Sequence, residues 1–209
     1  MTTTALGAPE QRVVMTGVSW ATYERLLADL KDSSSPRLTF DKGVLEVMSP
    51  SAEHEESNRT IALLVEVLAE EFGLDVRDLG STTFKREDLG RGFEPDSCFY
   101  IRNEARMRGK KEVDLTVDPP PDLVVEVDIT SPSLSKLPIY AAIGVPEIWR
   151  YDGQAVTILR LEGGGYAEAE ESAALPRVTG GDLSRFIREG ESKGRREWLS
   201  GVRVWARAK

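Results

Sequence analysis

The sequence predicts an α/β or α+β domain in which helices flank a mixed sheet. Segments with helical periodicity alternate with strand-like segments, in the order helix, hairpin, helix, strands, helix, strands, helices. One segment, residues 123–129, is hydrophobic enough to form a buried central strand. Sheets of this kind bind ligands at strand ends where the crossover connections diverge. This strand is therefore the first candidate position for a functional site.

The composition is that of an ordinary globular protein. The chain has 209 residues, of which 40% are hydrophobic and 30% charged. Its longest apolar stretches, such as 61–68, are too short to span a membrane, and the N-terminus lacks the pattern of a secretory signal. The single cysteine, Cys98, cannot form an internal disulfide, which suits a reducing cytoplasm. We expect a cytoplasmic protein with a flexible N-terminal segment at 1–18 and a single domain at 19–209 that ends in helices.

The charge balance argues against a protein that coats nucleic acid without specificity. The net charge is −8, whereas phosphate binding draws on clustered lysine and arginine. Basic residues do gather at 102–111 and at 193–209. Solvated faces of the molecule are the simpler explanation for both clusters.

The first third of the chain predicts a helix, a hairpin and a second helix. Ser19 can cap a helix that runs to the breaker at 32–36, with apolar residues at helical spacing. Strands at 37–40 and 44–48 are joined by Asp-Lys-Gly, a hairpin signal. Ser-Pro-Ser at 49–51 then starts a long helix, for which Gly73 is a good stop.

The remaining elements follow from shorter patterns. Strands are expected at 74–76, 82–85 and 97–101, with a loop at 86–92 and a short helix at 103–108. Three prolines at 119–121 lead into the strand at 123–129. Ser133 or Ser135 can cap a helix that runs to Gly144. A hairpin at 148–151 and 155–161, a strand near Tyr166, and helices at 183–188 and 197–206 complete the chain.

Glu126 lies in the middle of the apolar strand predicted at 123–129. Burial of an ionised carboxylate is costly unless a cation, a metal or a raised pKa accompanies it. Side chains alternate at about 3.3 Å per residue along a strand, so Asp128 lies on the same face as Glu126, roughly 6.6 Å away. The pair resembles half of a metal site.

Four motifs occur in a characteristic order. They are Glu46 before Met-Ser-Pro at 48–50, Glu-Pro-Asp at 94–96, Pro-Asp-Leu-Val-Val-Glu-Val at 121–127, and Lys136 and Tyr140 before Gly-Val-Pro-Glu-Ile-Trp at 144–149. Each motif alone is weak, but their joint order and spacing are specific. From about Ser19 to beyond Trp149 the chain resembles the bacterial Uma-type domains, a branch of the restriction-endonuclease-like PD-(D/E)XK nuclease superfamily.

The resemblance implies a restriction-endonuclease-like mixed sheet in which Asp96 and Glu126 ligate a divalent cation. Carboxylate oxygens suit Mg²⁺ or Mn²⁺. The metal would stabilise charge on the scissile phosphate and lower the pKa of a bound water. The superfamily places a lysine two residues after the second acid, where this sequence has Asp128. Uma-type members take the lysine from the following helix, which corresponds to Lys136; its ammonium could orient the attacking water or neutralise phosphate charge.

Two further residues match positions of the family. Glu46 matches an acidic residue that many such nucleases bring to the metal, directly or through water. His54, the only histidine, lies in the first turns of the long helix, where the family often has one. A lone histidine at a helix end is more often structural, so His54 is a candidate for a supporting role around the ligands, as is Asp128.

Each candidate also has a structural explanation. Asp96 could be a turn residue, Lys136 a solvated helix residue, and Asp128 a cap of the turn at 130–132. Glu126 could pair with a buried arginine, although its place in an apolar strand favours a site. The aromatic residues Trp149, Tyr151, Trp198 and Trp205 fit a core or an interface better than base stacking.

Two functions follow from these observations. The first is a Mg²⁺-dependent endonuclease, a hydrolase of phosphodiester bonds in nucleic acid and most directly in DNA. Such an enzyme would need two sites to cut both strands of a duplex, which favours a homodimer. The second is a catalytically inactive module that keeps the nuclease fold for interaction or assembly, and the acidic balance and displaced lysine leave room for it.

Overall fold

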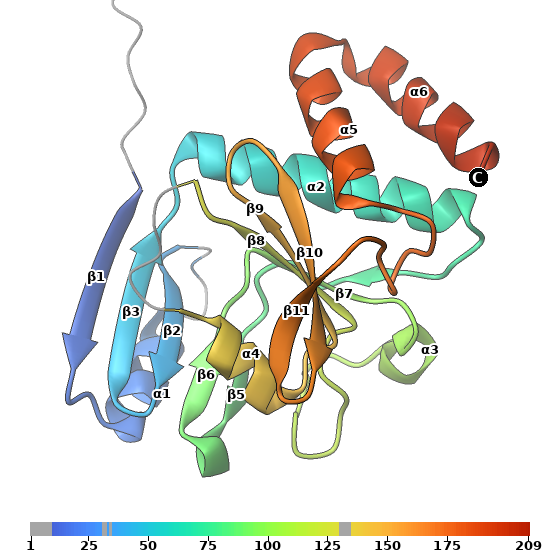
Figure 1. Ribbon diagram of the computed structural model, residues 1–209. Coiled ribbons are helices and arrows are strands. Elements are labelled where there is room, and N and C mark those ends of the chain that lie inside the picture. Colours follow the sequence, from blue (N-terminus) through green and yellow to red (C-terminus); the bar gives the residue numbers. More distant parts are fainter. Residues whose placement is uncertain (1–9, 31–32, 34, 130–134) are drawn as a thin grey trace, which may run out of the picture.

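The chain folds into two sheets with helices packed against them (Figure 1). The computed structural model describes residues 10–30, 33, 35–129 and 135–209. The first sheet has five strands in the order β1-β3-β2-β6-β5, and the second has six in the order β11-β10-β9-β8-β7-β4. Strands β8 and β9 pair in parallel and the other paired strands are antiparallel. The predicted fold class, a mixed sheet with flanking helices, is confirmed.

The first sheet is built mainly from the N-terminal part of the chain. Helix α1 covers one of its faces, where Tyr23 stacks on Phe40 with ring centroids 4.9 Å apart. Lys42 and Gly43, which both have φ above zero, form the tight turn between the two hairpin strands. The elements are β1 (Gln11–Thr16), α1 (Trp20–Leu30), β2 (Arg37–Asp41), β3 (Val44–Ser49), β5 (Phe84–Arg86), a single 3₁₀ turn (Glu87–Leu89) and β6 (Arg91–Phe93).

The second sheet forms the centre of the molecule. Its buried strand β8 carries side chains to both faces, in keeping with the near-continuous apolar run of its sequence. The elements are α2 (Ala52–Glu71), β4 (Arg77–Asp78), β7 (Ser97–Tyr100), α3 (Glu104–Met107), β8 (Leu123–Val127), α4 (Leu137–Ile143), β9 (Glu147–Tyr151), β10 (Val156–Glu162), β11 (Gly165–Ala169), α5 (Gly180–Ser192) and α6 (Arg195–Arg207).

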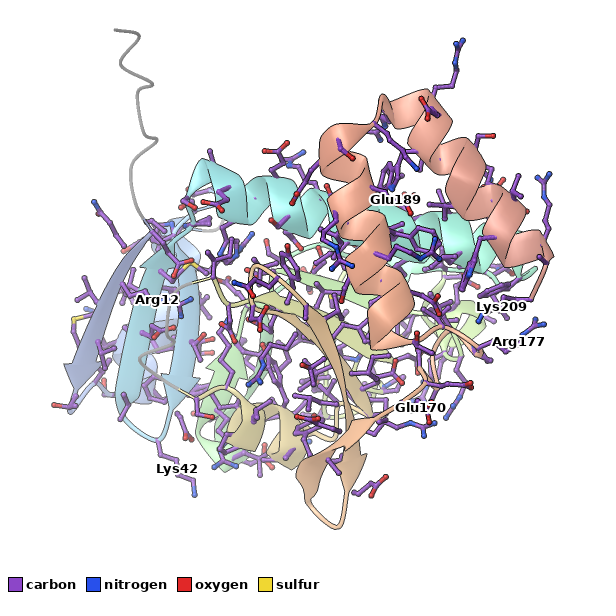
Figure 2. All side chains as sticks on the ribbon, turned by 45° about the horizontal axis from the view of Figure 1, so that its top comes forward. Arg12, Lys42, Glu170, Arg177, Glu189 and Lys209 are labelled. Atoms are coloured by element: carbon purple, nitrogen blue, oxygen red, sulfur yellow. The ribbon has the colours of Figure 1, made fainter. Side chains whose placement is uncertain are left out.

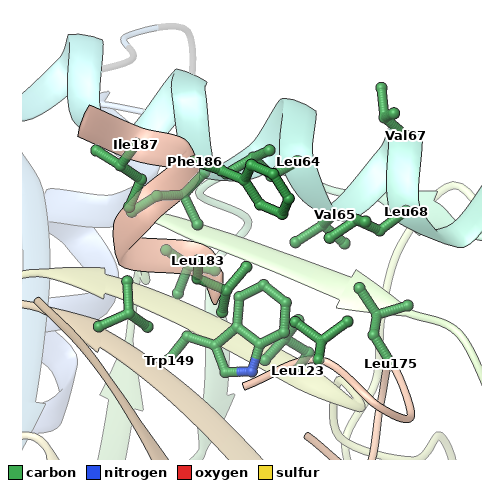
Figure 3. Close-up of a cluster of buried hydrophobic side chains, with 14 of the residues drawn as sticks. Leu64, Val65, Val67, Leu68, Leu123, Trp149, Leu175, Leu183, Phe186 and Ile187 are labelled. Carbon is green, nitrogen blue, oxygen red and sulfur yellow. The ribbon is translucent and has the colours of Figure 1, made fainter. Parts of the chain in front are cut away.

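The main hydrophobic core lies between the second sheet and helices α2, α5 and α6. Leu64 and Leu68 of α2 face Leu123 and Trp149 of the sheet, and Phe186 of α5 joins them (Figure 3). A smaller cluster on the other face packs α4 against β8, β9 and β6. Because side chains alternate along β8, Val125 and Val127 enter the α2 core, whereas Val124 lies in the α4 cluster. Glu126 therefore faces α4.

The N-terminal part of the prediction is corrected by the structure. We expected 1–18 to be a flexible segment, but Gln11–Thr16 form β1, which pairs with β3 along its whole length. Its apolar residues Val13, Val14 and Met15 are consecutive and do not alternate with polar ones, so the segment lacks the period-2 pattern of a strand. Residues 1–9 lie outside the described part of the chain.

Two further predictions are corrected. The loop expected at 86–92 contains the 3₁₀ turn and the start of β6. Its glycine, Gly92, is needed in the strand because a Cβ there would lie 2.4 Å from the Tyr23 hydroxyl of α1. The strand expected at 74–76 is instead β4 at Arg77–Asp78. Of the two alternative caps, Ser133 lies outside the described residues, and Ser135 does not cap α4, whose N-cap position is Lys136.

Candidate active site between the two sheets

The predicted acidic residues lie where the two sheets adjoin. After β6 of the first sheet, Glu94, Pro95 and Asp96 lead directly into β7 of the second. Strands β7 and β8 pair antiparallel with Ser97 opposite Val125, so the next step of that register puts Asp96 opposite Glu126. Side chains of opposite residues lie on the same face of a sheet. Both carboxylates are buried, with 2% and 5% of the residue exposed.

Glu126 is held by two side chains from the region of α4. Lys136, at the N-terminus of α4, donates from Nζ to Oε2 at 2.7 Å, and the Tyr140 hydroxyl donates to Oε1. The two donors lie four residues apart, so both project from the same side of the helix. Both oxygens of Glu126 therefore have a partner within the protein.

Burial makes Glu126 a titratable group near neutral pH. Burial raises the pKa of Glu126 to about 7, Lys136 opposes this rise, and the negative charges of Asp96 and Asp128 add to it. Burial would lower the pKa of Lys136, but Glu126 and Asp96 outweigh it and the pKa is raised. Lys136 is therefore an ammonium group at neutral pH, whereas Glu126 changes its charge there.

The pKa of Asp96 is shifted in the opposite direction to that of Glu126. Its Oδ1 contacts Arg37 Nη1 and lies 2.8 Å from His54 Nε2, while Oδ2 accepts the Val127 amide at 2.7 Å. Burial alone would raise the pKa of Asp96, but the bonds and charges of His54, Arg37 and Lys136 hold it at about 2. The amide of Asn58 also donates to the Asp96 carbonyl at 3.0 Å, which ties this segment to α2.

His54 connects Asp96 to the N-terminal strand. Ser51 caps α2 and accepts the His54 amide at 3.2 Å, which fixes the first turn of the helix. The imidazole Nδ1 lies 2.7 Å from Glu10 Oε2, just before β1. Burial would lower the pKa of His54, but Asp96 and Glu10 outweigh burial and the Arg37 charge, and the pKa is raised. His54 is thus clamped between two carboxylates rather than pointing at open solvent.

The other two acidic candidates lie toward β1. Glu46 of β3 is buried and accepts from Arg12 Nη1 at 3.2 Å, and Arg12 Nε donates to Glu10 at 2.6 Å. Arg12 lies among the strands of the first sheet, on the far side of the molecule from Lys209 (Figure 2). Asp128 directly follows β8, and burial raises its pKa while Lys136 and Arg12 oppose the rise. The structure thus brings Arg12 close enough to act on both Glu46 and Asp128.

Sequence reasoning missed the cations and the carboxylate that surround these candidates. Arg37 begins β2 and contacts Asp96, His54 and Glu55, and its buried Nε has no hydrogen-bond partner among the described residues. Glu10 and Arg12 come from the segment that we expected to be flexible. Nothing in the sequence marks these three, because strand pairing alone brings them to α2 and β8.

Two cavities adjoin the carboxylates. A cavity of about 520 Å³ lies beside Asp96 and is lined by Arg37, Asn58 and Arg59 among others. A cavity of about 60 Å³ lies beside Glu126 and is lined by Asp128, Lys136 and Tyr140 among others. The larger one is the more open approach to the site.

The donor set can be tested against a divalent metal. No group of three or more acidic, histidine or cysteine side chains in the described part of the chain is arranged to hold a metal ion. Mg²⁺, however, commonly takes only one or two carboxylates and keeps several waters. An ionised carboxylate has about four acceptor positions, so Asp96 and Glu126 keep capacity beyond their present bonds. Two hard carboxylates on adjacent strands fit Mg²⁺ or Mn²⁺.

Comparisons with known proteins agree with the resemblance of the motifs. The family model Uma2, described as a putative restriction endonuclease, matches residues 20–184. A solved structure of a putative nuclease belonging to DUF820 from Anabaena variabilis ATCC 29413 is similar, with a TM-score of 0.50 and 15% identity over 73% of this chain and 92% of that one. At that identity the likeness concerns the fold alone. A search of the curated proteins finds no match.

No helix in the described part of the chain is both long enough and apolar enough to cross a membrane.

Proposed function

The chain belongs to the Uma2 family, and from that premise we propose that it is a divalent-metal-dependent endonuclease that hydrolyses phosphodiester bonds in nucleic acid, with DNA as its main substrate. The observation that carries the proposal is the position of Asp96 opposite Glu126, with Lys136 Nζ 2.7 Å from Glu126 Oε2. Metal-dependent hydrolysis uses carboxylates that hold the cation, and here two carboxylates and a lysine meet on the face of the second sheet that α4 covers.

Asp96 and Glu126 would hold Mg²⁺ or Mn²⁺, which when bound neutralises charge on the scissile phosphate and lowers the pKa of a water. Lys136 would donate to a phosphate oxygen or hold the attacking water, because its ammonium already lies beside the proposed ligand and donates to the Glu126 carboxylate. Tyr140 fixes the second oxygen of Glu126. His54 and Arg37 keep Asp96 ionised, as its lowered pKa indicates.

Glu46 and Asp128 stay candidates at the edge of this site. Arg12 links the two through its bond to Glu46 and its charge near Asp128. We propose that they shape the charge of the site on the β1 side rather than hold the reacting group. For cleavage of both strands of a duplex, two chains would act together as a homodimer.

A cleavage assay with matched variants tests the proposal. We expect plasmid or oligonucleotide cleavage that requires Mg²⁺ or Mn²⁺ and that falls by at least about 100-fold in Asp96→Asn and Glu126→Gln, because loss of a ligand should exceed the 10–100-fold cost of losing an outer partner. The control is Glu147→Gln, which changes another buried strand carboxylate, 1% exposed, on the adjacent β9. Cleavage that persists in folded Asp96→Asn, or that needs no metal, would refute the enzyme.

The alternative is an inactive module that keeps the fold for interaction. One observation favours it: Lys136 and Arg37 already neutralise Glu126 and Asp96 within the protein. Calorimetric titration distinguishes the two functions. Absence of Mn²⁺ binding at millimolar concentration would support the module, whereas binding that is lost in Glu126→Gln would support the enzyme.

A further inference from the structure

Strand β1 lies at the edge of the first sheet and has only β3 as a strand partner among the described residues (Figure 1). An edge strand presents unpaired N–H and C=O groups, and proteins commonly blunt such edges with lysine, proline or a bulge. The sequence of β1, Gln-Arg-Val-Val-Met-Thr, contains neither lysine nor proline. Its register with β3 runs without interruption from Gln11 to Thr16, so no bulge breaks the strand.

The exposed side chains of β1 carry no charge, and its exposed apolar residues lie on both faces of the strand. Val13, Val14 and Met15 are 57%, 43% and 39% exposed, and they are three of the five exposed large hydrophobic residues in the described part of the chain. The one charged residue of the strand, Arg12, turns inward to Glu10 and Glu46, and its side chain is only 10% exposed. The chain as a whole carries a net charge of −8. At β1, two copies can therefore approach each other without bringing like charges together.

The apolar layer beneath the sheet reaches this edge. Val13 pairs with Val47 and Met15 with Leu45, so these side chains lie on the face that α1 covers. Val13 and Met15 thus extend this apolar face to the edge strand, where no other described residue buries them. If a second copy added its sheet at β1, each copy would cover the exposed apolar edge of the other.

We propose that two copies of this chain associate by antiparallel pairing of their β1 strands about a two-fold axis, which gives a sheet that runs through both copies. A strand is complementary to itself when it pairs antiparallel, so this contact closes as a dimer and uses up both open edges. The proposal assigns a surface to the dimer suggested above and does not depend on the hydrolytic reaction. It also links association to the site, because the inward face of β1 supplies Arg12 and is preceded by Glu10.

Sedimentation or light scattering of charged variants tests the surface. The wild-type chain should have twice the 23.1 kDa mass of one copy, whereas Val13→Lys combined with Met15→Lys should have the mass of one copy with an unchanged circular dichroism spectrum. The control is Val204→Lys, which places the same charge on α6 at a valine that is 65% exposed. The control should remain dimeric.

Single cysteines give a second measurement that does not depend on disrupting the strand. The native Cys98 is fully buried, so a new thiol at position 13, 14 or 15 would be the reactive one. We expect oxidation to cross-link copies in at least one of Val13→Cys, Val14→Cys and Met15→Cys, and not in Val204→Cys. A monomeric wild-type chain would overturn the dimer, while a wild-type dimer that neither cross-links here nor dissociates in the lysine variant would overturn this surface alone. Neither result bears on cleavage, which the Asp96 and Glu126 variants test separately.

Discussion

At the scale of single residues, the candidate site is centred on Glu126, because each of its carboxylate oxygens accepts a hydrogen bond from a residue of the α4 region. Tyr140 is fully buried and donates to one of them. Tyr140→Phe removes only this hydroxyl and leaves the ring packed against Phe93, whose centroid lies 4.5 Å away. The consequence should therefore be loss of orientation of Glu126 rather than loss of fold.

For Tyr140→Phe we expect metal-dependent cleavage to fall about 10–100-fold, the usual cost of removing a partner of a metal ligand. Mn²⁺ affinity should fall in parallel. Tyr166→Phe is a suitable control, since its hydroxyl donates at 2.6 Å to the carbonyl of Val145, just beyond the C-terminal end of α4. Equal cleavage by Tyr140→Phe and the wild type would show that the Tyr140 bond has no role in the site.

The pKa of Glu126 gives a pH dependence at the same scale. Since burial raises this pKa from 4.5 to about 7, a proton occupies the carboxylate below pH 7 and a cation has to displace it. Mn²⁺ affinity should increase by about tenfold per pH unit below pH 7 and level off above it. Calorimetry between pH 5.5 and 8.5 measures this, and an affinity that is constant over the range would contradict the assignment.

At the scale of elements, Glu147 shows how a buried carboxylate can be structural. It lies on β9 beside the site strand, and its oxygens accept Trp149 Nε1 at 2.8 Å, the Ser172 hydroxyl, and the Ala173 amide at 2.6 Å. These bonds fasten the segment before α5 to the sheet. Glu126 and Glu147 are therefore the same residue type on adjacent strands, and only their neighbours distinguish a candidate site residue from a structural one.

We expect Glu147→Ala to lower the free energy of unfolding by about 3 kcal/mol or more, because buried donors lose their acceptor. Glu147→Gln keeps an acceptor oxygen and should lose less. Urea denaturation measures both variants. If Glu147→Ala were as stable as the wild type, these bonds would not anchor the segment.

Elements with a clear period were predictable from the sequence. The helix at Trp20–Leu30, the hairpin of β2 and β3, and the central strand β8 were found because one period of hydrophobic residues dominates each. Strand β1 was missed because its exposed apolar residues depend on a distant partner, and β6 because Gly92 reads as a loop residue until Tyr23 is placed above it. Asp96, Glu126 and Lys136 were found as candidates through their motifs, whereas Arg37 carries no motif.

At the scale of the whole molecule, the site depends on how the two sheets meet. The first sheet brings Arg37, Glu46 and Arg12, the second brings Asp96 and Glu126, and helices α2 and α4 bring His54 and Lys136. The short connection from β6 to β7 joins the two sheets at this point. The chain belongs to the Uma2 family, and its structural neighbour is similar to it in fold.

The central claim is that Asp96 and Glu126 bind one divalent cation. Crystals soaked in Mn²⁺ and measured for anomalous scattering test it most directly. We predict one strong anomalous peak within about 2.0–2.3 Å of a carboxylate oxygen from each residue, as hard-cation coordination requires. A map with no peak there, with Lys136 still bonded to Glu126 and Arg37 to Asp96 at saturating Mn²⁺, would contradict it.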